Sequence, residues 1–466
     1  MVRVNRVQFL FLVLLIEAVL LFLLAPTGHS VWFSWLCMIQ FLFSTVVYIV
    51  VQQKNNYFDF DVIFLLTFFF IMFFFPVFMY GTDLEKLFFA FQYDYNHDVI
   101  SRATALSLLG AQAYMFGGIM VNKEKIKLKT VKAQTIIPNG ILTIEVLACF
   151  ALFFVAVGPE LFTHKYDGQV GGEGASAAVS YILVLLCALF ISAMTIEFHN
   201  WSIDKQYKKN VLLFFAMVVF MVVFLIVGSR TMPLQYGLLI LGIFSLKVRS
   251  INLKWMLIVV TSGIVVMGAF GLMRTQDEQG NDDLKEAAGP IVFVQDLVLN
   301  NRNTFMAIDM VDKDGIDFGV GMTTTLLGVF PFANSMVLNT TPLTELDMSS
   351  GLRITAKSLG TTRDFSVGFG TNIVADAYLS FGMIGVVFLL FALGYMVKYA
   401  MFKAQYQNNI YYLLFYAVMI SYSVYIVRAE VFVFIRYFVW GLIIVNIAKL
   451  YPYKLNFKIR KQVEKS

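Results

Sequence analysis

The chain has 466 residues, of which 59% are hydrophobic and only 14% are charged, and its mean hydropathy is +0.75. Soluble globular proteins are roughly 45–50% apolar and about 25% charged, so the composition excludes a soluble protein and indicates an all-α polytopic membrane protein. The formal net charge is only +5, and the basic residues lie in short segments, so nucleic acid is not expected as a partner.

Apolar stretches of about 20 residues, the length that crosses a bilayer as a helix, recur along the chain. We predict about 12 transmembrane helices, near residues 7–25, 31–51, 60–80, 98–121, 139–157, 177–198, 210–228, 231–246, 253–273, 373–399, 408–427 and 431–450. Residues 1–273 therefore hold helices 1–9, and residues 274–372 form one long loop between helices 9 and 10. Residues 373–466 hold helices 10–12 and a basic tail. The phenylalanine-rich runs 68–70 and 73–75 are predicted to face lipid.

Basic residues predict the orientation, because cytoplasmic loops of membrane proteins collect lysine and arginine. With twelve spans, every strongly basic segment falls on one side of the membrane, namely residues 3–6, 123–132, 205–209, 247–254 and 449–465. Both termini are therefore predicted to be cytoplasmic, and the long loop is predicted to be extracytoplasmic.

The long loop is expected to be functional, since structureless loops of this length are uncommon. Its stretch from Phe318 to Leu338 is almost entirely apolar, but glycines and a proline weaken it as a free helix. We predict an interfacial or re-entrant element there. The alternative is a thirteenth span, which would invert the last three helices and violate the charge rule at two loops.

Arginines gather on the predicted outer side, where topology disfavours positive charge. Because the guanidinium group suits bidentate contact with phosphate oxygens, the pattern indicates an anionic, phosphorylated ligand handled outside the cytoplasm. Each such residue could instead be an interfacial anchor or a solvated loop cation, and an anchor is an equal alternative for Arg102. The predicted diphosphate- and substrate-binding residues, led by the first two, are Arg230, Arg428, Arg436, Arg353, Arg363, Arg302 and Lys357.

Three acidic residues near these cations are candidate catalytic bases. Asp376 lies at the start of a predicted span, and Asp364 lies in the loop beside Arg363. Either could accept a proton from an attacking hydroxyl. Glu430 is a third candidate, although an ion pair with Arg428 or Arg436 is its simpler role.

Metal or cofactor chemistry is not indicated by the sequence. The three cysteines, Cys37, Cys149 and Cys187, lie within apolar spans at spacings that fit neither a disulfide framework nor a metal site. No nucleotide-binding loop and no serine-nucleophile motif is present. No metal and no cofactor are therefore expected.

Two segments and the overall plan resemble the Wzy-type polymerases that join oligosaccharide repeat units in bacterial envelopes. Ile226-Val-Gly-Ser-Arg230 at the end of a span is similar to the Gly-Ser-Arg signature of that family. Gly368-Phe-Gly-Thr-Asn-Ile-Val-Ala-Asp-Ala-Tyr-Leu-Ser-Phe-Gly-Met-Ile-Gly385 resembles the family's passage from the large loop into the next helix. The family usually has Glu where this chain has Asp376.

The resemblance implies a glycosyltransferase of the bacterial inner membrane that uses undecaprenyl-diphosphate-linked glycans as donor and acceptor. The growing glycan would pass to a sugar hydroxyl on the incoming unit, with release of undecaprenyl diphosphate. Membrane lipids, a chain-length regulator and a flippase are the other partners that it implies. Two alternatives remain: an O-antigen ligase of similar plan, and a flippase or transporter. The long external loop argues against a transporter, which should show two similar halves.

Overall fold

The computed structural model describes residues 6–83, 85, 89–127, 136–158, 177–227, 229–275, 295–362, 365 and 368–463. Every regular element in these ranges is a helix, as the composition predicts. Contacts divide the chain into two compact units. Unit 1 comprises Met1–Asn122, Ile251–Tyr399 and Ser423–Phe434, and unit 2 comprises Lys123–Ser250, Ala400–Tyr422 and Ile435–Ser466.

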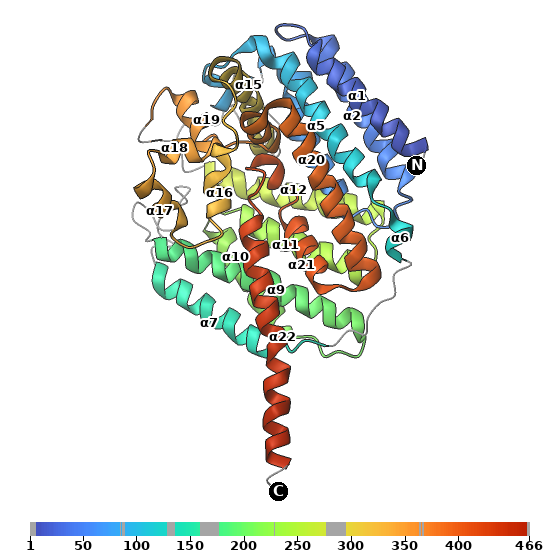
Figure 1. Ribbon diagram of the computed structural model, residues 1–466, viewed down its shortest axis with the longest axis vertical. Coiled ribbons are helices and arrows are strands. Elements are labelled where there is room, and N and C mark those ends of the chain that lie inside the picture. Colours follow the sequence, from blue (N-terminus) through green and yellow to red (C-terminus); the bar gives the residue numbers. More distant parts are fainter. Residues whose placement is uncertain are drawn as a thin grey trace. The chain divides into compact units, whose positions relative to one another are not determined.

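Unit 1 contains the long helices at the N-terminus and the short helices of the predicted loop (Figure 1). Its long helices are α1 (Arg6–Leu23), α2 (Val31–Val51), α3 (Phe60–Met72), α5 (Ile100–Met120), α12 (Leu253–Thr275) and most of α20 (Ile373–Gln407). Its short helices are η1 (Phe75–Met79), η2 (Phe89–Gln92), η3 (His97–Val99), α14 (Gln295–Val298), η5 (Leu299–Asn301), α15 (Arg302–Asp314), η6 (Val320–Met322), α16 (Thr323–Leu327), α17 (Ala333–Thr340), α18 (Glu345–Met348), α19 (Ser350–Leu359) and η7 (Ile426–Arg428).

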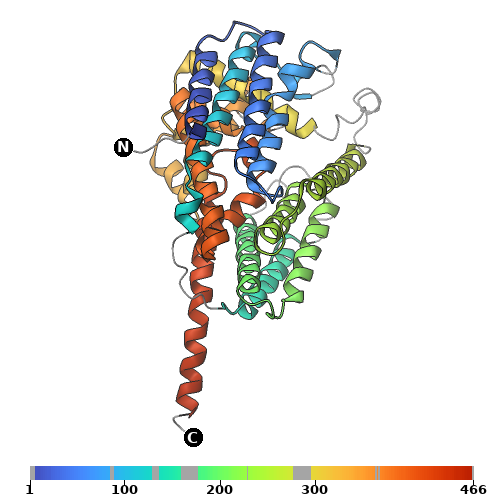
Figure 2. The same cartoon turned by 90° about the vertical axis from the view of Figure 1, so that its right-hand side faces the viewer.

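Unit 2 is built around α9, which contacts α7, α21 and α22. In Figure 2, α22 is the long red helix that runs to the C-terminus. The helices of this unit are α6 (Lys123–Lys127), α7 (Gly140–Val157), α9 (Ala177–Ile203), α10 (Val211–Ile226), α11 (Thr231–Lys247), α21 (Ile410–Ser421) and α22 (Ile435–Val463).

Seven helical stretches in the described part of the chain are long and apolar enough to cross a membrane. They are Arg6–Leu23, Val31–Val51, Phe60–Met79, His97–Met120, Gly140–Val157, Val179–Ile203 and Ile373–Gln407. The protein is therefore a multi-pass membrane protein, whereas the total of about twelve spans stays a prediction.

The apolar stretch from Phe318 to Leu338 does not form one long helix. It is divided among η6, α16 and α17, which have 3, 5 and 8 residues. A helix needs about 20 residues to cross the hydrocarbon core, so this stretch contains no thirteenth transmembrane helix. The break before α17 lies at Pro331, which lacks a backbone N–H, and at Phe332, whose φ is +65°.

The prediction that the phenylalanine runs face lipid is wrong for half of them. Phe68, Phe73 and Phe75 are fully buried, and the rings of Phe41 and Phe73 stack with centroids 4.7 Å apart. The ring of Phe75 lies 3.7 Å from that of Phe91. An apolar side chain suits lipid and protein interior equally well, so an unbroken apolar sequence cannot distinguish the two.

Close contact between α5 and α20 fixes the middle of unit 1. A Cβ atom at Gly117 would collide with the carbonyl oxygen of Phe391, and one at Gly394 would collide with that of Tyr114. The two backbones touch because neither glycine has a side chain, as is common between membrane helices.

The start of α20 is anchored, and the helix is broken in its third turn. Asn372 Oδ1 accepts hydrogen bonds from the backbone N–H groups of Val374 (3.1 Å) and Ala375 (2.9 Å), which caps the helix. Farther along, Phe381 and Gly382 leave helical geometry, and Gly382 has a φ of +63°. The segment that carries Asp376 is thus a short helical piece of its own.

Candidate functional site

Helix α19 is the element on which the candidate cations and acids of unit 1 meet. Ser349 caps it by accepting the N–H of Leu352 at 3.4 Å, and Gly360 ends it in the left-handed region. Arg353 and Lys357 lie four residues apart and therefore on one face of the helix.

Two acidic side chains lie at the beginning of α19. Asp376 is 0% exposed, and its Oδ2 accepts the backbone N–H of Val431 at 2.8 Å. Glu430 Oε1 accepts the hydroxyl of Ser349 at 2.8 Å. Because Glu430 immediately precedes Val431, the buried Asp376 holds the backbone that presents the Glu430 carboxyl.

The environment of Glu430 differs from the expected ion pair. Burial raises the pKa of the Glu430 carboxyl, while hydrogen bonds from Ser349 and from the backbone of Gly351 oppose the rise. Within the described part of unit 1, no ion pair joins Glu430 to Arg428. The simpler role predicted for Glu430 is therefore wrong as far as Arg428 is concerned, because a serine and a helix N-terminus supply its hydrogen bonds instead.

Behind this pair, the buried hydroxyl of Ser350 lies beside the Asp376 carboxyl and hydrogen-bonds to it. Asp376 is therefore held from two sides, by the first turn of α19 and by the backbone of Val431.

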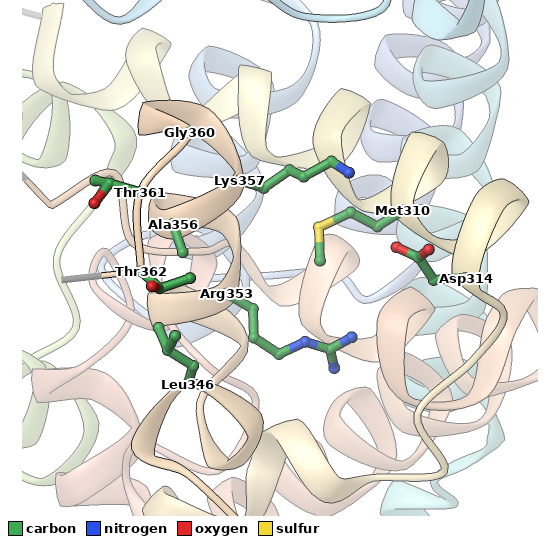
Figure 3. A pocket seen from close by; sticks show the side chains of 9 residues that line it. All are labelled: Met310, Asp314, Leu346, Arg353, Ala356, Lys357, Gly360, Thr361 and Thr362. Carbon is green, nitrogen blue, oxygen red and sulfur yellow. The ribbon is translucent and has the colours of Figure 1, made fainter.

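A pocket of about 390 Å³ opens between α19 and α15 (Figure 3). Arg353 and Lys357 extend from α19 toward Met310 and Asp314 of α15. The lining residues are Met310, Asp314, Leu346, Arg353, Ala356, Lys357, Gly360, Thr361 and Thr362. With an exposed lysine and a half-buried arginine on one wall, the pocket can receive an anionic group.

Arg353 is held by an acid that sequence reasoning did not single out. Its Nη1 lies 2.5 Å from Oδ2 of Asp317, and the Asp317 carboxylate also accepts the N–H groups of Gly319 (2.9 Å) and Gly321 (3.2 Å). Asp317 precedes a run of apolar residues and looks like an ordinary loop acid in the sequence. Only the fold brings it to Arg353.

Arg302 is not an accessible loop cation. Its side chain is 0% exposed, and its guanidinium donates to Ser358 Oγ at 2.6 Å and to the carbonyl oxygen of Asp94 at 2.8 Å. It also lies 5.0 Å from the Phe369 ring and 5.8 Å from the Tyr95 ring. Burial lowers the pKa of Arg302 to about 10. Its contacts join α15, α19 and the segment before η3, which is a structural role.

The remaining predicted arginines are distributed over both units. Arg428 ends η7 in unit 1, is half-buried, and makes no side-chain hydrogen bond or ion pair within the described part of that unit. Arg230 precedes α11 and Arg436 lies in the first turn of α22, both in unit 2. Arg363 and Asp364, like Gly228 of the Gly-Ser-Arg segment, lie outside the described residues.

Arg102, for which an anchoring role was considered, forms an ion pair instead. Its Nη2 lies 2.5 Å from Oδ1 of Asp312, near the end of α15. No group of three or more His, Cys, Asp or Glu side chains in the described ranges is arranged to hold a metal ion.

A buried ionic cluster in unit 1 was also missed from the sequence. Asp61 pairs with Lys398 and with Lys54 (3.0 Å), Lys54 pairs with Asp59 at 2.7 Å, and the hydroxyl of Tyr114 donates to Asp61 at 2.6 Å. These residues join the start of α3 and the second half of α20 to α5. Asp61 and Lys398 are charges inside apolar spans, and that signal could have found the pair.

Comparison with known families identifies the kind of protein that carries this arrangement. The sequence model of the O-antigen polysaccharide polymerase Wzy matches residues 6–460, which is nearly the whole chain. The chain belongs to the Wzy family. The predicted resemblance to this family is thus confirmed, and Wzy proteins are glycosyltransferase-type polymerases that act on lipid-linked oligosaccharides in membranes. Comparisons with curated proteins and with solved structures give no match.

Proposed function

We propose that this Wzy-family protein joins undecaprenyl-diphosphate-linked oligosaccharide repeat units on the outer face of the bacterial inner membrane. The growing glycan passes to a hydroxyl of the acceptor sugar, and undecaprenyl diphosphate is released. Family membership supports the repeat-unit polymerase. The strongly basic segments are predicted to be cytoplasmic, which supports an outer position for the long loop and its site.

The observation that carries the site assignment is that α19 brings two kinds of group together. At its beginning lie the Glu430 carboxyl and the buried Asp376, and along its length lie Arg353 and Lys357. A transfer between a hydroxyl and a diphosphate leaving group needs a proton acceptor and fixed positive charge. Both are supplied here by one helix and its neighbours.

In the proposed reaction, the acceptor hydroxyl oxygen attacks the anomeric carbon of the donor sugar. The bond from that carbon to the diphosphate oxygen breaks, and the electron pair leaves with the diphosphate. Glu430 accepts the hydroxyl proton, since its carboxyl is partly exposed whereas Asp376 is fully buried. Asp376 acts as a positioning residue through Val431, and Arg353, Lys357 and Arg428 stabilise the negative charge that develops on the leaving group.

The test compares Glu430→Gln with Glu345→Gln in a strain whose own copy of the gene has been deleted. Glu345 is an exposed acid in the first turn of α18 and undergoes the same chemical change. We expect Glu345→Gln to restore a full ladder of polymer lengths on a gel. Glu430→Gln should lower the rate by about 10²- to 10⁴-fold, the usual contribution of a general base, and leave single-unit products.

Equal amounts of the two variants in the membrane are the required control. Long polymer from Glu430→Gln at wild-type level would exclude Glu430 as the base. Failure of the wild-type gene to restore any polymer would exclude the polymerase function itself.

A further inference from the structure

One face of α20 is exposed and apolar along several turns. Phe381 is 40% exposed, Ile384 is 75% exposed and Phe388 is 67% exposed. Ile384 and Phe388 lie four residues apart after the break and therefore on one side of the helix, and Phe381 lies at the break just before them. Because α20 is a membrane-spanning helix, this face is a surface for hydrocarbon chains.

The apolar face continues onto the turn between α15 and η6. The N–H of Asp317 donates to the carbonyl oxygen of Leu379 at 3.0 Å, which ties the turn to α20 just before its break. A Cβ atom at Gly319 would lie only 2.8 Å from Cζ of Phe381, so the Phe381 ring rests on the backbone of this turn. Phe318, which lies between Asp317 and Gly319, therefore belongs to the turn that contacts Phe381.

Phe318 is an exposed aromatic residue of this turn. Its φ is +55° and that of Gly319 is +86°, and the N–H of Val320 donates to the carbonyl oxygen of Asp317 at 3.2 Å, so Phe318 and Gly319 are the two central residues of a tight turn. The side chain of Phe318 is 77% exposed, so its ring is available to a ligand.

The same turn ends at the cation of the pocket. Asp317, the residue before Phe318, holds the guanidinium of Arg353 at 2.5 Å. The exposed apolar residues of α20 and Phe318 form what we call the apolar track. It ends at Phe318, next to Asp317, which holds the pocket residue Arg353. A molecule with a long hydrocarbon chain and an anionic head matches both ends of this track.

We propose that the polyprenyl chain of the lipid-linked substrate lies along Phe388, Ile384 and Phe381 and across Phe318, which places its diphosphate beside Arg353. This inference rests on the proposed function and adds the binding site for the lipid chain. Phe318 is a specificity-determining residue in this scheme, because it contacts the part of the substrate nearest the charged head.

The first experiment uses Phe318→Gly, with Phe332→Gly as the matched control. Phe332 is also exposed and also has a positive φ, of +65°, but it lies at the start of α17, away from the α20 face. Glycine relieves the strain at either position, so neither variant should lose stability. For Phe318→Gly we expect KM for a long-chain substrate to rise roughly tenfold, the effect of losing one aromatic contact.

Chain length separates a lipid contact from a general defect. With a substrate analogue that carries a short prenyl group, Phe318→Gly and the wild-type protein should have the same KM. An unchanged KM for the long-chain substrate in Phe318→Gly, an equal rise with both substrates, or the same rise in Phe332→Gly would overturn the lipid track while leaving the polymerase intact. Inactive wild-type protein would instead refute the proposed function.

The second experiment places a photo-crosslinking phenylalanine at position 318, 384 or 16 of the full chain in phospholipid nanodiscs containing polyprenyl phosphate. Ile16 is an exposed residue of α1 and reports on ordinary contact with lipid. We expect positions 318 and 384, but not 16, to crosslink polyprenyl phosphate above its share of the lipid. Crosslinking in proportion to lipid composition at all three positions would show that the face meets only bulk phospholipid and would overturn the proposal.

Discussion

At the scale of single residues, burial separates side chains that the sequence presents as equivalent. Arg302 and Arg353 both lie in the predicted external loop, yet Arg302 is fully enclosed and Arg353 borders a pocket. Asp376 and Glu430 differ in the same way, since only Glu430 has an exposed part. Loss of an enclosed group should lower stability, whereas loss of a pocket group should lower activity.

The hydrogen bond from Ser349 to Glu430 leads to a prediction about pH. Burial raises the pKa of Glu430, and a base must be ionised, so polymerisation should decline as the pH falls through that raised pKa. Ser349→Ala removes a bond that opposes the rise. The acidic limb of the rate profile should therefore move to higher pH in Ser349→Ala, as measured with purified protein and lipid-linked substrate.

A control for this prediction is Thr344→Ala, which removes a different helix cap, that of α18. Its acidic limb should stay where it is in the wild-type protein. An unchanged limb in Ser349→Ala would mean that another group controls the pH dependence.

At the scale of elements, the break in α20 gives its first turns a direction of their own. Gly382 has a φ of +63°, and a Cβ atom there would lie 3.7 Å from its nearest neighbour, Ile316 Cγ2. A methyl group would therefore fit at this position, but alanine rarely adopts this backbone conformation. Gly382→Ala should destabilise the protein by about 1 kcal/mol, measured by thermal unfolding in detergent.

Gly140→Ala serves as the comparison for Gly382→Ala. Gly140 begins α7, has no positive φ, and has no heavy atom within 4 Å of an added Cβ. Alanine there should be neutral or slightly stabilising, since it favours the helix. Equal effects of the two substitutions would show that the break does not depend on the glycine conformation.

The buried ionic cluster connects elements that are distant in the chain. Asp61 in α3 and Lys398 in α20 are 337 positions apart and both nearly inaccessible. Asp61→Ala leaves Lys398 without its counterion, and loss of one partner of a buried pair costs about 3–5 kcal/mol, so the melting temperature should fall strongly. Lys398→Met should lower it less, because Lys54 still pairs with Asp61 at 3.0 Å. Lys313→Met should change it least, because Lys313 is exposed and Asp309 keeps the hydrogen bond from Asn96.

At the scale of the whole molecule, the predicted arginine set spans both units. Arg428 belongs to unit 1, and Arg230 and Arg436 belong to unit 2. We predict that Arg230→Ala and Arg428→Ala leave the folded protein in the membrane at wild-type amounts but yield single-unit products instead of long polymer. Lysine at either position should restore little, because it lacks the planar fork that binds two phosphate oxygens. Long chains from either alanine variant would exclude that arginine as a ligand of the diphosphate.

Sequence patterns were informative where the signal is local. The helix predicted at 31–51 is found at Val31–Val51, and the start predicted at 373 is found at Ile373, because length, apolarity and a capping asparagine mark such elements. Contacts between residues far apart in the sequence leave no such local signal. The Asp317–Arg353 pair, the burial of Arg302 and the Asp61–Lys398 pair depend on which elements meet, and a uniformly apolar sequence does not specify that.

The pairing of Arg353 with Asp317 means that this cation already has a counterion before any ligand arrives. In the proposed reaction, a diphosphate that binds there exchanges one anionic contact for another, so the net gain in free energy is small. A polymerase must free its leaving group after every transfer, and tight product binding would slow each cycle. The internal carboxylate would therefore shorten the time that the product occupies the site and favour repeated turnover.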